Sequence, residues 1–367
     1  MLEGGKINTR QAAYLLIFTI MPTAILFVPA ITTKAAGQDG WLSVVVATVF
    51  GLLAGGLILA LSLRFPGKNL YEFVQVLLGK ILGKVIILGY IWYFFHAGAA
   101  IIREYGEFLT TAIMPETPLM AFNAIIVLVA VYAVRSGLEV LARIADFIFP
   151  LVAGAIGLVV ILPLKEIDFS RFLPILENGI KPVIKGAIVP SSWYGEVVIM
   201  AVFLAYLNQP EEGKKVVVWG TLVNGLSLLV VVIGAMLVFG AVEAAKLMFP
   251  MFSMARMISI GEFLEGVESL VMAIWVAGVF LKIAIYYYVG VLGIGYLFGL
   301  KDYRPAVIPY GVAMVMLSVV SYESIMDLVE FLDKIWPPYA LSIFQIGLPV
   351  ILLVVSYLKA GKEEKIS

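Results

Sequence analysis

Apolar runs that are long enough to cross a lipid bilayer follow one another along this sequence of 367 residues. A bilayer core about 30 Å thick takes about 20 helical residues per crossing. Hydrophobic residues make up 62% of the chain and charged residues 14%, which is more apolar surface than a soluble core needs. We therefore expect an all-α polytopic membrane protein that forms a single integral membrane domain over residues 1–367. About ten spans are expected, over residues 10–34, 41–64, 82–112, 119–136, 139–164, 183–207, 214–241, 266–298, 305–321 and 337–358.

The positions of Lys and Arg predict how the chain lies in the membrane. If the N-terminus is cytoplasmic, most of these residues fall in loops on the cytoplasmic side, as the positive-inside rule requires. Both termini are then cytoplasmic, because the number of expected spans is even. A formal net charge of zero argues against a nucleic-acid partner, and the lack of cysteine excludes thiol chemistry and disulfides. We expect no cofactor and no metal site.

The first apolar run, Tyr14 to Ala36, is interrupted near its middle by Met21-Pro22-Thr23-Ala24. Pro22 has no N–H group and its ring crowds the preceding turn, so a continuous helix through it is costly. In hydrocarbon, the freed backbone groups must find partners in protein, water or a ligand. The segment therefore predicts either a tolerated kink or a binding site at the centre of the bilayer.

The sixth run repeats this pattern, with Pro190-Ser191-Ser192-Trp193-Tyr194-Gly195-Glu196 between two apolar halves. After each interrupted run come a long glycine-containing span and a short amphipathic stretch, at residues 69–79 and 247–263. This matching order in two halves of five spans predicts an inverted repeat, about 10–164 and 183–358, with broken first and sixth helices. Paired broken helices in such a repeat point to the ligand, which favours a binding site over a kink.

Four local motifs resemble those of one known family. They are the junction Thr32–Trp41, Arg103 together with Pro115-Glu116-Thr117-Pro118, the pair Gly195-Glu196, and Phe298–Pro305. With them the chain resembles, over essentially its whole length, the B subunit of GerA-type germinant receptors, in the amino acid–polyamine–organocation transporter superfamily. The resemblance implies a leucine-transporter-type fold, the inner membrane of a spore, A and C partner subunits, and a small germinant, often an amino acid. Many members carry a Gly-x-Gly-like break where this chain has Pro22-Thr23-Ala24.

Broken helices offer unpaired amides at one half-helix end, which favour a carboxylate, and unpaired carbonyls at the other, which favour an ammonium group. An amino acid zwitterion needs both kinds of partner. We expect its carboxylate near Thr23-Ala24-Ile25 and its ammonium group near the carbonyls of residues 190–193. The expected ligand-binding residues are Pro22, Thr23, Ala24, Ile25, Tyr93, Ala97, Ser192, Trp193, Tyr194, Gly195, Glu196 and Lys282.

Two charged residues within spans are functional candidates, because burying a charge in a membrane is expensive. Glu196 follows the second interruption and either accepts from neighbouring amides or faces the ligand as a proton-responsive group. Lys282 lies near the middle of the eighth span. By the resemblance, that span holds a sodium ion in sodium-coupled relatives, so the ammonium group is a candidate substitute for the ion. The alternative is a salt bridge from Lys282 to Glu196 or Asp146.

The third span places Tyr93, Ala97, Ala100 and Glu104 on one face at helical spacing. We expect Tyr93 and Ala97 to line the cavity or to pack in the core. Trp193 and Tyr194 in the second interruption are candidates for a gate or a pocket wall.

Other polar residues have structural expectations. Arg103 and Glu107, four residues apart, predict an ion pair. Asp146 is expected to pair with Arg143 or Lys282. His96, the only histidine, is expected to be a hydrogen-bonded helix residue rather than a proton relay.

Two functions fit these features. The first is a germinant receptor subunit, whose ligand shifts a conformational equilibrium that partner subunits read. The second is an amino acid or polyamine transporter, coupled to protons. An enzyme is not expected, because the sequence has one histidine, no cysteine and no Gly-x4-Gly-Lys-Ser/Thr phosphate loop.

Overall fold

The computed structural model describes residues 2–257 and 267–363, and this part of the chain is almost entirely helical. Eight helical stretches in it are long and apolar enough to cross a membrane, and Arg304–Val320 is a shorter apolar helix. One of the eight, Thr9–Leu63, contains two helices, α1 and α2. The protein is therefore an integral membrane protein, and the number of ten crossings stays a prediction.

The helix bounds agree with the predicted spans to within a few residues, except where a short stretch precedes a span. Helix α3 begins before the predicted span 82–112 because it includes the predicted stretch 69–79. Residues 258–263 and 266, which belong to other predicted segments, lie outside the described residues. The helices are α1 (Thr9–Ala36), α2 (Gly40–Leu63), α3 (Leu70–Ala112), α4 (Leu119–Ser136), α5 (Leu138–Ile161), α6 (Ile180–Tyr194), α7 (Met200–Phe203), α8 (Gly213–Ala244), α9 (Pro250–Met257), α10 (Val267–Phe298), α11 (Val307–Val320), α12 (Ile325–Glu330), α13 (Trp336–Tyr339) and α14 (Gly347–Glu363).

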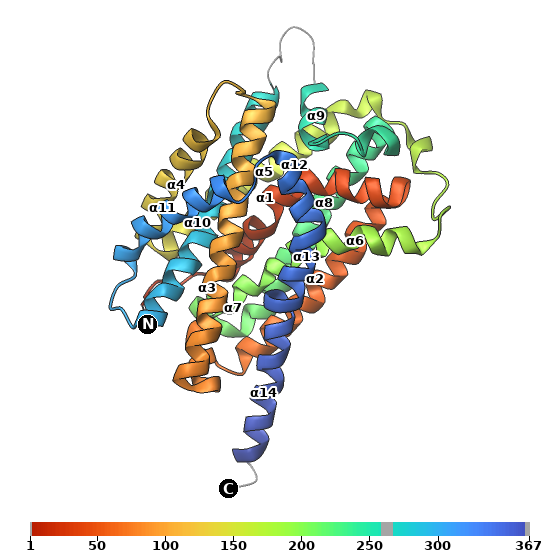
Figure 1. Ribbon diagram of the computed structural model, residues 1–367. Coiled ribbons are helices and arrows are strands. Elements are labelled where there is room, and N and C mark those ends of the chain that lie inside the picture. Colours follow the sequence, from red (N-terminus) through yellow and green to blue (C-terminus); the bar gives the residue numbers. More distant parts are fainter. Residues whose placement is uncertain (1, 258–266, 364–367) are drawn as a thin grey trace.

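Helix α1 is the central element of the bundle (Figure 1). It packs against α5, α6, α8 and α10, and every residue from 15 to 29 is buried. A helix that is apolar all round is stable only when protein or lipid surrounds it. Here protein surrounds α1 on all sides, so other helices can place side chains against any part of its middle.

The prediction of a broken first helix is wrong. Helix α1 runs without interruption from Thr9 to Ala36 through Pro22 and Pro29. The tolerated-kink interpretation therefore fits the backbone, because packing on all sides holds the helical path. The segment still has an external partner, since the indole Nε1 of Trp275 donates to the carbonyl oxygen of Pro22 at 2.6 Å.

The second interruption changes the type of helix but does not unwind it. Helix α6 continues through Pro190 to Tyr194, and the chain then tightens into a 3₁₀ segment, η4 (Gly195–Ile199), before α7. A 3₁₀ stretch inside a longer helix is frequent at functional hinges and strained sequences. The transition at Gly195 lies where the sequence predicted a break.

Helix α3 shows how the predicted stretch 69–79 is built. Asn69 caps its start, and Glu72 completes a capping box by accepting from the Asn69 amide. Gly79 has φ 79°, a left-handed conformation that bends the helix and that other residues rarely adopt. The stretch is thus a short helix joined to the long span at a glycine.

The segment before α1 and the end of α14 both lie in the lower half of the structure in Figure 1. Near the N-terminus, Ile7 pairs with the chain around Leu207 through hydrogen bonds from the Ile7 amide and to its carbonyl. The arrangement agrees with an even number of crossings, and the cytoplasmic side stays a prediction.

Glycines let α2 approach its neighbours closely. A Cβ atom on Gly55 would lie 2.3 Å from Cγ1 of Val217 in α8, and one on Gly51 would lie 2.6 Å from the Tyr194 ring. The spacing Gly51-x3-Gly55 is typical of close helix packing, and these contacts are of that kind. Gly56, the next residue, has no atom within 4 Å of such a position.

We expect Gly55→Ala to destabilise the protein by roughly 1–3 kcal/mol, because the added methyl group forces α2 and α8 apart. Gly56→Ala is the matched control and should be neutral or stabilising, since alanine favours a helix by about 0.5–1 kcal/mol over glycine. Thermal unfolding of both variants in detergent measures the difference. Equal stability of the two would contradict the packing described here.

Candidate functional site

The most unusual feature of the core is a buried ion pair between two helical segments. The Lys282 ammonium nitrogen lies 2.9 Å from Oε2 of Glu196, and both residues are buried. Lys282 belongs to α10 and Glu196 to η4, just after the change from α to 3₁₀ helix. Of the two predicted arrangements for Lys282, the salt bridge to Glu196 is the one that the structure contains.

Thr23 on α1 joins this pair to two further helices. Its hydroxyl oxygen accepts from Lys282 at 2.9 Å and from the indole Nε1 of Trp193 at 3.0 Å. Two accepted hydrogen bonds occupy both lone pairs of the Thr23 hydroxyl oxygen, so the hydroxyl proton can be donated to another group. The carboxyl group of Glu104 on α3 lies beside it. We call Thr23, Glu104, Trp193, Glu196 and Lys282 the central cluster.

The central cluster joins α1, α3, α6 with η4, and α10 at one point inside the bundle. Removing one partner of a buried ion pair typically costs 3–5 kcal/mol, whereas apolar residues of similar volume would often be equally stable. Stability alone therefore does not explain why Glu196 and Lys282 are charged. The arrangement can hold or exchange charged groups at the centre of a membrane protein.

A second polar group lies next to the cluster on the last part of the chain. The Gln345 amide nitrogen donates to the Tyr93 hydroxyl and to the Ser192 carbonyl, each at 2.8 Å. Gln345 ends the π-helical segment η10 (Ala340–Gln345), and its side chain lies directly against Gly195. Single π turns in helices are frequent at functional sites.

Sequence reasoning missed Gln345 and did not place Glu104 among the binding residues. Glu104 is a carboxylate within a membrane-length span, next to Arg103, and Gln345 is an amide within an apolar run; a polar group inside a span is the signal that could have found them. Glu104 was expected only as part of one face of the third span.

The other predicted site residues fall into two groups. Tyr93 and Ala97 are buried, with Tyr93 facing Gln345 and stacking on Trp336. Tyr194 points away from the cluster, because its hydroxyl accepts from Thr48 of α2 and its ring covers Gly51. Tyr194 therefore has a packing role here, while Trp193 belongs to the cluster.

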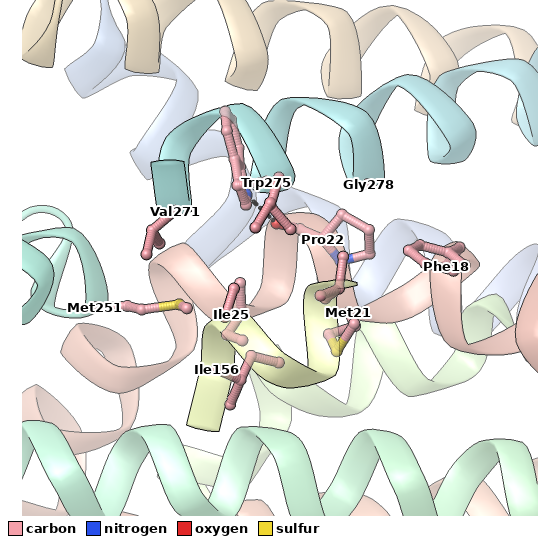
Figure 2. A pocket seen from close by; sticks show the side chains of 12 residues that line it. Phe18, Met21, Pro22, Ile25, Ile156, Met251, Val271, Trp275 and Gly278 are labelled. Atoms are coloured by element: carbon pink, nitrogen blue, oxygen red, sulfur yellow. Dashed lines mark hydrogen bonds between the residues drawn. The ribbon is translucent and has the colours of Figure 1, made fainter. Parts of the chain in front are cut away.

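Residues 22–25 of α1 face different surroundings. Pro22 and Ile25 line a small apolar cavity of ≈ 20 Å³ together with Trp275, as Figure 2 shows, and Ala24 is fully buried. A volume of this size holds about one water molecule, so an amino acid does not fit there without movement of the helices. The amides of residues 23–25 lie within a continuous helix, so the expected carboxylate site on unpaired amides is absent from this described segment.

A larger cavity of ≈ 370 Å³ lies at the far ends of α1 and α6. Phe27 and Val189 line it, and each stands four residues, about one helical turn, from a cluster residue. Its wall also holds Lys34, Lys185 and Asp333. The cavity is thus a space of ligand size that ends about one turn from the central cluster.

The predictions for other polar residues have mixed outcomes. The ion pair between Arg103 and Glu107 is confirmed, at 2.6 Å between buried side chains. The prediction for Asp146 is wrong, because its carboxylate pairs with Arg10 at 3.2 Å. The N-terminal segment reaches across to α5, which sequence spacing could not show.

The prediction that His96 is a hydrogen-bonded residue fails for one of its two ring nitrogens. Its Nδ1 has no hydrogen-bond partner among the described residues, and the ring packs against Trp92, Phe331 and Trp336. His96 therefore lies in an aromatic environment of α3, α13 and the neighbouring segments.

Comparison with known proteins agrees with this architecture. The family model described as spore germination protein matches residues 6–325. Spore germination protein KB of Bacillus subtilis (strain 168) is 29% identical over 368 residues, which cover 99% of this chain and 98% of that protein.

Two solved structures share the fold at low sequence identity. A Na⁺-coupled sialic acid symporter in a substrate-bound outward-open state has a TM-score of 0.69 at 12% identity, over 94% of this chain and 80% of that chain. MhsT in complex with L-phenylalanine has a TM-score of 0.65 at 13% identity, over 98% of this chain and 99% of that chain. These likenesses confirm the predicted leucine-transporter-type fold, and the inverted repeat stays a prediction. The chain itself belongs to the spore germination protein family.

Proposed function

We propose that the chain is the membrane subunit of a spore germinant receptor. It binds a small germinant of the amino acid type at the central cluster and signals to A and C subunits to trigger germination. Its place is the inner membrane of the spore, with both termini cytoplasmic. The function is binding and signalling rather than catalysis. The single observation that carries the proposal is the buried ion pair between Lys282 and Glu196.

An amino acid zwitterion carries the same two charged groups as this ion pair. Its carboxylate can therefore replace Glu196 at the Lys282 ammonium, and its ammonium group can replace Lys282 at Glu196. Such an exchange leaves no buried charge without a partner, which keeps its cost low. This assignment replaces the backbone amides of α1 with two side chains as the expected partners of the ligand.

The exchange also supplies a signal. In the ligand-free protein, Lys282 binds α10 to η4 through Glu196 and to α1 through Thr23. A ligand inserted between these groups separates the segments by its own size. A ligand shifts a conformational equilibrium only if it binds one arrangement better than the other. This ligand fits only the arrangement in which Lys282 and Glu196 are apart, so it favours that arrangement. The cavity beside Phe27 and Val189 is the proposed route to the cluster.

The second candidate is a proton-coupled amino acid or polyamine transporter. The observation that favours it is the fold, which this chain shares with a sialic acid symporter and with MhsT in complex with L-phenylalanine. Both functions use the same site, so partners and uptake distinguish them.

Blocked ligands test the exchange of charges. The twenty amino acids are first screened by thermal shift, and the most stabilising one is compared with its methyl ester and its N-acetyl derivative. Each blocked form loses one charge-assisted partner, worth about 1.5–3 kcal/mol, and should bind about tenfold or more weakly. Equal affinities of the three forms would rule the proposed site out.

Replacing Lys282 with Met should abolish binding of that amino acid, because its carboxylate loses its cationic partner. Lys215→Met, at an exposed ion pair with Glu212, is the control and should bind normally. Since Lys282→Met leaves Glu196 unpaired, the double variant Lys282→Met/Glu196→Leu should recover stability without recovering binding. Binding by the stable double variant, measured by thermal shift, would contradict the assignment.

Uptake separates receptor from transporter. The purified chain alone, in liposomes with an imposed proton gradient, should accumulate none of the screened amino acid. Germination of spores should instead require the chain together with its A and C subunits. Gradient-driven accumulation by the chain alone would favour the transporter.

A further inference from the structure

Glu104 is a buried carboxyl group without a salt-bridge partner among the described side chains. Its side chain is 3% exposed, and its Oε2 atom has no hydrogen-bond partner among the described residues. Among the Lys and Arg side chains that the structure describes, none places a nitrogen within 4 Å of this carboxylate. An unpaired buried carboxylate is expensive at the centre of a membrane, so Glu104 requires a positive charge from another source.

The cationic side chains near Glu104 already have other partners. Lys282 pairs with Glu196. Arg103, next to Glu104 on α3, pairs with Glu107 and also donates to the carbonyls of Ser318 and Val319. The central cluster therefore holds two carboxylates and one ammonium group, and carries one surplus negative charge when both carboxylates are ionised.

The surroundings of Glu104 are rich in oxygen atoms without partners. The hydroxyls of Tyr286 on α10 and Tyr322 after α11 are both buried, and neither has a hydrogen-bond partner in the described part of the chain. Both tyrosines lie close enough to Glu104 to interact with its charge, Tyr286 also lies beside Glu196, and Thr23 lies within hydrogen-bonding reach of Glu104. Buried polar atoms without partners mark places where a water, an ion or a ligand group binds.

We propose that Glu104 is an exchangeable site for one positive charge. A proton occupies it in the empty protein, and a monovalent metal ion or an ammonium group of the ligand replaces that proton. The part that concerns the ligand rests on the proposed function, whereas the proton and the metal ion do not. By this charge balance, a zwitterionic amino acid binds together with one proton or metal ion. A ligand with an additional ammonium group, such as a basic amino acid or a polyamine, binds without a proton or metal ion at Glu104.

Infrared spectroscopy of the purified, ligand-free chain in lipid tests the proposal directly, because a protonated carboxyl group has its own carbonyl stretch. The wild type should show this band, and Glu104→Gln should lose it. Glu196→Gln should lose it as well, because Glu104 then becomes the partner of Lys282 and ionises. Lys282→Met should gain a second protonated carboxyl, since two carboxylates are left without a cation. Glu116→Gln, at an exposed loop carboxylate, is the control and should leave the band unchanged.

Salt identifies the source of the charge. Loss of the wild-type band in NaCl or KCl, but not in choline chloride, assigns the site to a metal ion. Loss only on raising the pH assigns it to the proton, and loss on adding lysine or putrescine in choline chloride assigns it to an ammonium group. A wild-type spectrum without the band at any pH, or a band that survives both Glu104→Gln and Glu196→Gln, overturns the proposal. Because no germinant is present in the first measurement, its result is independent of whether the chain binds an amino acid.

Discussion

The buried ion pair between Lys282 and Glu196 holds together the segments that form the proposed site. The Lys282 nitrogen lies 2.9 Å from the Glu196 carboxylate, and both side chains are buried. Through Thr23 the pair joins α1, η4 and α10, which are far apart in the sequence. Apolar residues of similar volume are often as stable as a buried ion pair, so stability alone does not explain the charges. The proposed exchange with a ligand that carries the same two charges would supply that explanation.

Helix α1 provides the setting for this pair. Because other helices surround it, a chain with two prolines keeps a continuous helical path, and the carbonyl of Pro22 finds a donor in Trp275. The same reasoning applies to the second segment, where Gln345 donates to the carbonyl of Ser192. Both interruptions in the sequence are thus positions where a helix accepts hydrogen bonds from side chains of other elements. Side-chain partners of this kind can be replaced by a ligand at lower cost than the hydrogen bonds of a helix.

The sequence predicts the spans well because membrane-length hydrophobic runs depend on local composition. It also predicts the short stretch that ends at Gly79 and the pair of Arg103 with Glu107, since these depend on neighbours in the chain. The continuity of α1 could not be predicted, because tertiary packing on every side outweighs the local cost of Pro22. The partner of Asp146 depends on the path of the N-terminal segment, which has no local signal.

The central cluster was predicted only in part for a related reason. Charge within a span identifies Glu196 and Lys282 as candidates. Glu196 is one of the two salt-bridge partners that the sequence predicts for Lys282. That Thr23 accepts from both Lys282 and Trp193 requires the relative rotation of α1, α6 and α10, which no spacing within one helix determines. The same rotation turns Tyr194 toward α2, although it is adjacent to Trp193 in the sequence.

Membership of the spore germination protein family and a transporter-type fold are compatible with one another if the site of a transporter is used to sense a ligand. In that case a ligand needs to separate groups that are joined in its absence, and no passage through the membrane is required. An experimental structure of the chain with its bound amino acid tests this most directly. The account predicts the ligand carboxylate on the Lys282 ammonium, with the Glu196 carboxylate displaced to the ligand ammonium. An intact pair of Lys282 and Glu196, with the ligand bound elsewhere, would contradict it.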